Sequence, residues 1–297
     1  MATIARIIVT EADLRNKHKL FSDFVTESEK LLPKGEKHQF VLLPAGFLTF
    51  SIKNNLAGTP LAEPNERTAK QQWNAKIESL KEQALSEFYR SFDSEMLKEL
   101  KTVANYLIIG IDSTVKDKKD IRIQFVLVYD LQSDKPLHWT GKTYPQPGER
   151  DCLIRMSVDT HFIQEKIDGK KVAVFGCHDL SIFNPRHQHH FSPFDDERNG
   201  AKRKENTTPG KIKCPFIDAT LDFGPEIMLQ LPHSEGTWAA KWTTLDKWLR
   251  RKNKNRGLQH FATGLKKNPK DGKQYTLSGT QRGDVMNFAD GKWIDVK

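Results

Sequence analysis

The sequence lacks long hydrophobic runs. No stretch of about 18 consecutive apolar residues occurs in the chain, so we expect no transmembrane helix. The short apolar patch at residues 4–9 is followed at once by charged residues, a pattern that excludes a secretory signal peptide. No lipidation signature is visible. These absences predict a cytoplasmic protein without a membrane partner.

Cysteine is also scarce. The three cysteines, Cys152, Cys177 and Cys214, are odd in number and widely spaced. Their spacing excludes both a disulfide framework and a C-x-x-C zinc site, and it indicates a reducing compartment. The chain also has no internal repeat, no low-complexity tract and no linker that would divide it. We therefore expect a single domain over residues 1–297.

Acidic residues are fewer than basic ones, 38 against 47, which gives a net charge of +9. This excess favours anionic partners. Basic clusters at residues 202–204, 250–256 and 266–273 would suit a phosphate-bearing ligand or a nucleic acid if they met on one face. They lack the interleaved aromatic residues of single-strand binders, however, and solvated loops without a binding function are the explanation that we favour. A binding module for nucleic acid or another anionic ligand is therefore the alternative to an enzyme.

Apolar runs and helical stripes alternate along the chain, which predicts an α/β fold. A long amphipathic helix carries Trp73, Ile77 and Leu80 on one stripe, and residues 238–249 form a second helical pattern. Residues 184–219 are polar with little apolar periodicity, so we expect an inserted loop there. Residues 275–296 predict a closing hairpin. The predicted buried strands are residues 4–9, 39–43, 106–111, 121–129, 172–175 and 222–231.

The strand at residues 172–175 ends in Gly176 and Cys177. A cysteine that a buried strand delivers into a sharp turn lies at a sheet edge, where neighbours can lower its pKa and a substrate can approach. This is the position of a nucleophile. A buried structural cysteine explains the same pattern, and other parts of the chain must decide between the two.

Four short motifs together resemble the nitrilase, or carbon–nitrogen hydrolase, superfamily. VLLPAGF has the strand, proline, glycine and phenylalanine that surround the family's glutamate, but Ala45 occupies the position of the glutamate. WTGKTYP places Lys142 where the family has its lysine, and FGCHDL places Cys177 at the nucleophile position, with Asp179 also matching. Glu149 in QPGERD stands where many members have a further glutamate. The resemblance covers nearly the whole chain.

The resemblance implies a four-layer α-β-β-α sandwich that forms a homodimer and needs neither a cofactor nor a metal. It also implies covalent chemistry on a small-molecule amide, or less favourably a nitrile. Cys177 would be the nucleophile, Lys142 and the backbone N–H of His178 would stabilise the oxyanion, and Glu149 would support the site. The family's general base is missing at Ala45, and the loss of a general base removes a factor of about 10²–10⁴ in rate. We therefore expect the enzyme to be impaired or inactive as written.

Three explanations of Ala45 stay open, in this order of preference. It is an engineered substitution in an active enzyme, or a natural loss that left a pseudoenzyme, or the mark of a site in which His178, His233 or Glu149 performs the proton transfer. The order rests on the retention of Cys177, Lys142 and Glu149, because a long-abandoned site should have lost more than one member.

Other polar and aromatic residues have competing explanations. We expect His178, Tyr144, His233 and Trp238 to contact the substrate, although histidines satisfied by hydrogen bonds and a core tryptophan fit the sequence as well. A metal site is the less favoured explanation of a histidine-rich stretch that is followed by two aspartates, because the spacing matches no strong metal signature. That stretch comprises His187, His189, His190, Asp195 and Asp196.

Overall fold

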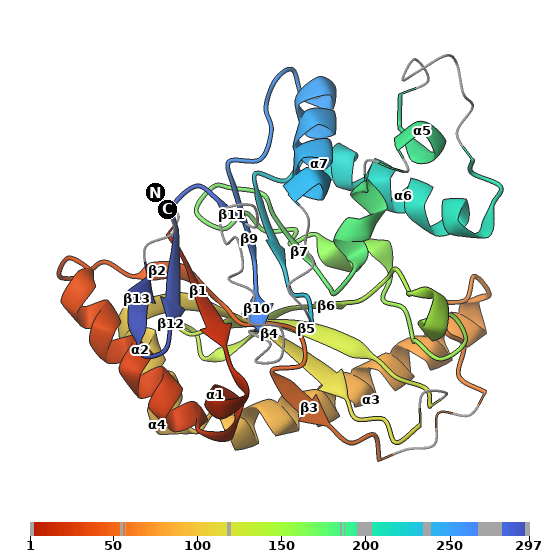
Figure 1. Cartoon of the computed structure of the whole chain (residues 1–297). Helices are drawn as coiled ribbons and strands as arrows, with labels where there is room; N and C mark the ends of the chain where they lie inside the picture. The colour runs from red at the N-terminus through yellow and green to blue at the C-terminus, as the bar shows by residue number, and fades with distance from the viewer. Residues whose placement is uncertain are drawn as a thin grey trace.

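A computed structural model describes residues 3–53, 56, 58–117, 120–184, 186, 188–194, 204–233, 239–266 and 281–294. Within these residues the strands form two sheets (Figure 1). The larger sheet runs in the order β13-β12-β1-β2-β4-β5-β6, with β3 paired to β4 and β10 paired to β1. Its strands are β1 (Ile4–Val9), β2 (His38–Leu42), β3 (Leu48–Phe50), β4 (Ala104–Ser113), β5 (Gln124–Asp130), β6 (Lys135–Gly141), β10 (Leu265–Lys266), β12 (Val285–Ala289) and β13 (Lys292–Ile294).

The smaller sheet has the order β11-β9-β8-β7, and β7, β8 and β9 are parallel to one another. Its strands are β7 (Val172–Phe175), β8 (Ile227–Gln230), β9 (His260–Thr263) and β11 (Gln281–Arg282). All side chains of β7 and β8 are buried, as expected for parallel strands covered on both faces.

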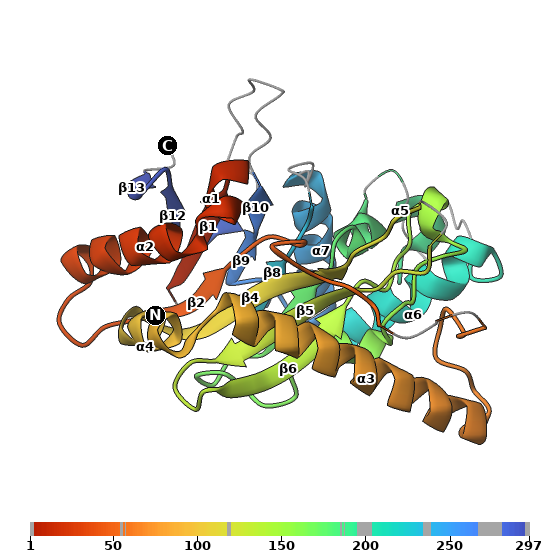
Figure 2. The same cartoon turned by 90° about the horizontal axis from the view of Figure 1, so that it is seen from below.

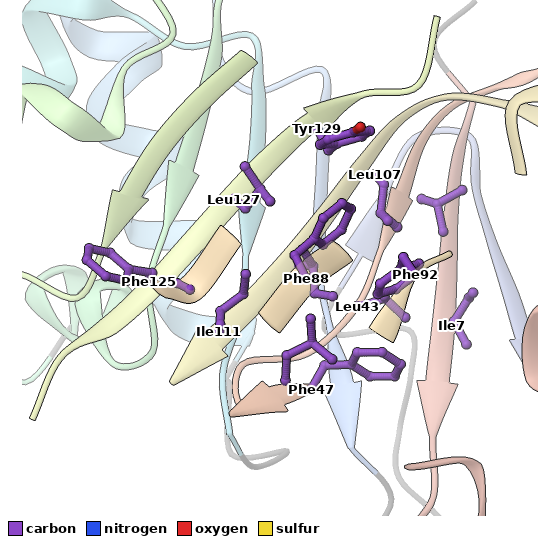
Figure 3. Packing of buried hydrophobic residues seen from close by; sticks show 14 of the residues in the cluster. Ile7, Leu43, Phe47, Phe88, Phe92, Leu107, Ile111, Phe125, Leu127 and Tyr129 are labelled. Carbon is purple, nitrogen blue, oxygen red and sulfur yellow. The ribbon is translucent and has the colours of Figure 1, made fainter. Parts of the chain in front are cut away.

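Three helices cover the outer face of the larger sheet: α2 (Lys17–Leu31), α3 (Arg67–Ser91) and α4 (Ser94–Val103). Figure 2 shows α3 lying across the strands β4 to β6. The rings of Phe88 and Phe92 stack at a centroid distance of 4.8 Å, and Phe47 lies against Phe92 (Figure 3). This layer is the largest apolar cluster among the described residues.

The outer face of the smaller sheet is covered by two helices, α6 (Thr208–Phe223) and α7 (Ala239–Lys252). They share an apolar cluster with Phe175 of β7 and Met228 of β8. A third apolar cluster lies between the sheets, where Phe40 and Leu42 of β2 meet Val174 of β7. The layers are therefore helix, sheet, sheet, helix, and the predicted four-layer sandwich is confirmed. The remaining short elements are α1 (Glu11–Arg15), α5 (Gln188–Phe191) and the 3-10 turns η1 (Pro147–Glu149), η2 (Val158–His161) and η3 (Asp179–Phe183).

The structure corrects one expectation about the chain. Residues 208–219, which we predicted as the end of an inserted polar loop, form most of helix α6. Thr207 caps this helix by accepting a hydrogen bond from the backbone N–H of Gly210, and Pro209 stands in its first turn. Lys213 and Pro215 interrupt the apolar pattern, yet Phe216 and Ile217 are fully buried.

Other predicted elements agree with the structure. The helix expected at residues 238–249 is α7, and the turn at Asp290 and Gly291 joins β12 to β13 as an antiparallel hairpin. Among the described helices, none is both long and apolar enough to cross a membrane. Of the predicted closing hairpin, residues 275–280, 295 and 296 lie outside the described residues.

Candidate active site

Cys177 follows β7 at the point where the chain turns sharply into η3. His178, the next residue, has φ of +65° and ψ of −10°, in the left-handed region. A residue other than glycine rarely adopts this conformation, and its occurrence marks a turn held in place by its surroundings. The side chain of Cys177 is 2% exposed, and it lies in the apolar cluster between the sheets with Ala45.

Asp179 fixes this turn against the segment that carries Lys142. Its buried carboxylate accepts hydrogen bonds from the backbone N–H groups of Thr143 (3.1 Å), Tyr144 (2.7 Å) and Gly176 (3.1 Å). Burial raises the pKa of Asp179 to about 7, while the backbone donors and the charge of Lys142 act in the opposite direction. One carboxylate thus joins the residues after β6 to the residues before Cys177.

Lys142 comes directly after β6 and is 1% exposed. Its Nζ forms a short ion pair with Oε2 of Glu149, which also accepts a hydrogen bond from the backbone N–H of Gln146 at 2.8 Å. Burial would raise the pKa of Glu149, but the hydrogen bond and charge of Lys142 outweigh it and keep the pKa below its usual value. The ammonium group is thereby held in one place beside the Cys177 turn.

His233 follows the end of β8 and contacts Cys177 twice. Its backbone N–H donates to the Cys177 sulfur over 3.4 Å, and its side chain is also hydrogen-bonded to that thiol. The ring nitrogen Nε2 forms a short ion pair with Oδ2 of Asp112 at the end of β4. His233 therefore links the cysteine to a carboxylate.

These contacts shift two pKa values in opposite directions. Burial would raise the pKa of the Cys177 thiol, but hydrogen bonds and positive charge from His178 and His233 lower it to about 6. Burial would lower the pKa of His233, but its bonds to Asp112 and Cys177 raise it to about 10. Between these values the site holds a thiolate beside an imidazolium, the reactive state of a cysteine nucleophile.

Ala45 lies in the turn after β2, which the structure places beside these groups. Its backbone N–H donates to the carbonyl of Pro232, the residue before His233. Gly46 has φ of +65°, and a Cβ there would lie 3.2 Å from Oδ2 of Asp112 and 3.3 Å from the ring of His233. A longer side chain at position 45 would therefore start from the turn that already packs against the Asp112–His233 pair.

A pocket of about 350 Å³ opens beside these groups. Its lining is mostly polar, because several charged or ionisable side chains converge on it from β4, the segment before β5, η1 and the residues that follow β6, β7 and β8. They are Asp112, Arg122, Lys142, Glu149, His178 and His233. The arrangement combines a lowered-pKa thiol, a fixed ammonium group and a histidine paired with a carboxylate, which are the components of covalent acyl transfer.

No family model and no curated protein matches the chain. Solved structures similar to it include a mutant of the amidase from Nesterenkonia sp. AN1, with an acetamide moiety on its active-site cysteine. Identity to this amidase is 12% and the TM-score is 0.46, with 100% of this chain and 88% of that chain covered. The carbon–nitrogen hydrolase from Helicobacter pylori G27 is 12% identical, with a TM-score of 0.45 over 99% of this chain and 84% of that chain.

A further similar structure is the glutamine-dependent NAD+ synthetase from Acinetobacter baumannii. Its identity is 12% and its TM-score 0.40, and the match covers 84% of this chain and 35% of that chain. The Nesterenkonia amidase is described as a member of the nitrilase superfamily, which the sequence motifs also resemble. Similarity at this level concerns the backbone, and the chemistry is argued from this chain's own residues.

The structure brings most of the predicted site residues together. The pocket is lined by Lys142, Glu149, His178 and His233. Cys177 is next to His233, whose backbone N–H donates to the cysteine sulfur. Tyr144 is placed differently, with its ring 5.0 Å from Nζ of Lys213 and packed into the apolar cluster under α6 and α7. The described pocket lining does not include it. Trp238 lies outside the described residues.

Asp112 was missed in the sequence, although it directly follows the predicted strand at residues 106–111. Polar residues at strand ends are candidates for a site, and this signal could have identified it. Gln124 and Arg122 also line the pocket and were missed. They stand within or before a strand, where a polar residue is ordinarily the solvent-facing member of an alternating pattern.

The predicted alternative sites gain no support from the part of the chain that the structure describes. No cluster of three or more potential metal ligands occurs there. His187, Asp195 and Asp196 lie outside it, as does the side chain of His189, and the ring of His190 packs against Phe191. Of the three basic clusters, only residues 250–256 are described throughout, and Arg250 is paired there with Asp246.

Proposed function

We propose that this protein hydrolyses the carbon–nitrogen bond of a small non-peptide amide through a thioester on Cys177. One observation carries the proposal. Cys177, whose pKa is lowered to about 6, accepts a hydrogen bond from the backbone N–H of His233, and His233 lines a pocket that also presents the Lys142–Glu149 ion pair.

In the first step the Cys177 thiolate attacks the amide carbon, a carbon–sulfur bond forms, and the carbonyl electrons move onto oxygen. The Lys142 ammonium group and the backbone N–H of His178 stabilise this oxyanion. The intermediate collapses as the carbon–nitrogen bond breaks and the amine leaves with an added proton. Water then attacks the thioester, which releases the carboxylic acid and restores the thiolate.

Glu149 acts on this reaction through Lys142. A charged lysine that is 1% exposed and has no partner would destabilise the fold, because burial removes its hydration. Glu149 supplies the opposite charge. The ion pair holds the ammonium group in position before the oxyanion forms. Preorganised charge of this kind contributes to catalysis because little rearrangement is needed during the reaction.

The size and lining of the pocket favour a compact polar substrate. A volume of about 350 Å³ is near the lower end of the range for small-molecule sites, and it suits an amide of few heavy atoms. A nitrile would follow the same path through a thioimidate. We propose the amide because the ammonium group of Lys142 in the pocket lining matches a developing oxyanion.

The test is acylation of Cys177. Wild type, Cys177→Ala and Cys152→Ala are incubated with p-nitrophenyl acetate, whose acylating power does not depend on recognition, and with a panel of simple amides. Intact mass and peptide mapping follow the adduct. We expect one acetyl group per chain on Cys177 in wild type and Cys152→Ala, none at this position in Cys177→Ala, and amide turnover that depends on Cys177. Equal labelling of Cys177→Ala, or no labelling of Cys177 by the ester, would contradict the proposal.

A further inference from the structure

The position of the missing glutamate has a neighbour that can exchange protons. The turn at residues 44–46 packs directly on Asp112 and His233, as the short approaches to Gly46 show. Asp112 and His233 come from the ends of β4 and β8, more than a hundred residues apart in sequence. Their side chains are 14% and 36% exposed, so the pair lies at the boundary between the protein interior and the pocket.

We propose that His233, oriented by Asp112, performs the proton transfers that a glutamate at position 45 would otherwise perform. This inference rests on the proposed amide hydrolysis and names the group that completes it. Asp112 binds Nε2 of His233 and so leaves Nδ1 as the nitrogen that exchanges protons with the reacting atoms. An acid or base must lie within hydrogen-bonding reach of the reacting groups, and His233 already contacts the Cys177 sulfur, to which its backbone N–H donates over 3.4 Å.

Of the other ionisable groups near the thiol, His178 also lowers the pKa of Cys177 and lines the pocket, but its partner differs from that of His233. Glu149 is held by Lys142, and Nε2 of His178 forms a short hydrogen bond with Nε2 of Gln146. Asp179 is fully buried and accepts three backbone hydrogen bonds that maintain the Cys177 turn. His233 alone among these groups combines contact with the thiol, a carboxylate partner and access to the pocket.

The proton steps balance with no further reagent than water. The imidazolium of His233 donates its Nδ1 proton to the amine nitrogen as the carbon–nitrogen bond breaks, and becomes neutral. The neutral imidazole then accepts a proton from the water that attacks the thioester, and the thiolate leaves. His233 ends as the imidazolium and Cys177 as the thiolate, which is the starting state.

The experiment separates leaving groups that need a proton from those that do not. An amine must be protonated as it departs, whereas p-nitrophenolate departs without a proton. For His233→Gln we expect amide acylation to fall by about 10²–10⁴-fold. Its stoichiometric burst with p-nitrophenyl acetate is retained at pH 9, and the acetyl group then persists on Cys177 because deacylation lacks its base. His18→Gln, an exposed histidine on α2, is the matched control.

Asp112→Asn tests the positioning role. We expect the upper limb of the pH profile for amide acylation to shift to lower pH, because the imidazolium loses its carboxylate partner. The charged groups that face His233 or share its pocket remain in this variant, so the shift reports on Asp112. They are Cys177, His178, Lys142, Glu149 and Arg122.

The outcomes separate this inference from the proposed function. If wild type shows no ester burst on Cys177, the proposed function itself fails. If the burst occurs and His233→Gln cleaves amides at the wild-type rate, the proposed function stands and the role of His233 is overturned. An unshifted pH profile in Asp112→Asn would overturn the role of Asp112 alone.

Discussion

At the scale of single residues, Asp179 joins the two segments on which the site depends. We predict that Asp179→Asn destabilises the fold by about 1–3 kcal/mol, because the new amide NH2 group would face the backbone N–H of Gly176 or another donor and leave it unpaired. Acylation of Cys177 should fall by about 10²-fold as the turn shifts. Urea unfolding and ester burst kinetics measure both effects.

Asp222→Asn is the control for this prediction. Asp222 is 68% exposed and pairs with Lys252 at the surface, so its substitution should change the unfolding free energy by less than about 0.5 kcal/mol. If Asp179→Asn is as stable and as reactive as Asp222→Asn, the three backbone hydrogen bonds do not organise the site.

Position 45 offers a second residue-scale prediction. Ala45→Glu would bring a carboxylate to the turn beside Asp112, where like charges disfavour each other. Since His233 is the acid and base in our account, we expect amide turnover to rise by less than about 10-fold or to fall. Steady-state assays of Ala45→Glu and of wild type measure this. A rise of about 10²-fold or more, the usual contribution of a general base, would show that the site lacked one.

At the scale of elements, close contacts between backbones set the positions of the strand ends. A Cβ on Gly110 of β4 would lie 2.4 Å from Cα of Ala45 and 2.8 Å from the carbonyl of Pro44. We predict that Gly110→Ala costs about 1–3 kcal/mol of unfolding free energy, because the turn at residues 44–46 must move. Thermal and urea unfolding measure the change.

Gly148→Ala is the matched control for Gly110→Ala, since a Cβ at Gly148 meets no atom within 4 Å. We expect its unfolding free energy to lie within about 0.5 kcal/mol of wild type. Equal stability of the two variants would mean that β4 does not approach the turn closely.

Sequence reasoning predicted the elements that have regular patterns and missed those that depend on distant contacts. The buried strand 172–175 and the stripe of Trp73 and Ile77 carry their own periodicity, so they could be recognised locally. Helix α6 could not, because Lys213 in its buried face is accommodated by the rings of Tyr144 and Phe191, which come from other segments. The Asp112–His233 pair likewise joins residues that only the folded sheets bring together.

At the scale of the whole molecule, stability depends on a histidine buried between layers. His161 is fully buried, bonds Thr143 and the carbonyl of Val174, and lies 4.6 Å from the ring of Phe216. Burial lowers its pKa from 6.5 to about 3. As the pH falls below 6.5, the unfolded chain gains a proton at His161 before the folded protein does, so stability is lost toward pH 3.

We predict that His161→Gln removes this contribution. The slope of unfolding free energy against pH between 6.5 and 4 should differ from wild type by up to about 1.4 kcal/mol per pH unit, with wild type losing stability faster on acidification. Urea unfolding at a series of pH values measures the slopes. Identical slopes would contradict the prediction.

The central claim is that the two sheets and their turns hold Cys177 as a thiolate at neutral pH. The most direct test is the rate of Cys177 alkylation by iodoacetamide as a function of pH, followed by peptide mass spectrometry. We predict a rate that is half-maximal near pH 6, the pKa that His178 and His233 impose on the Cys177 thiol. A midpoint near 8.5, as for an ordinary thiol, would contradict it.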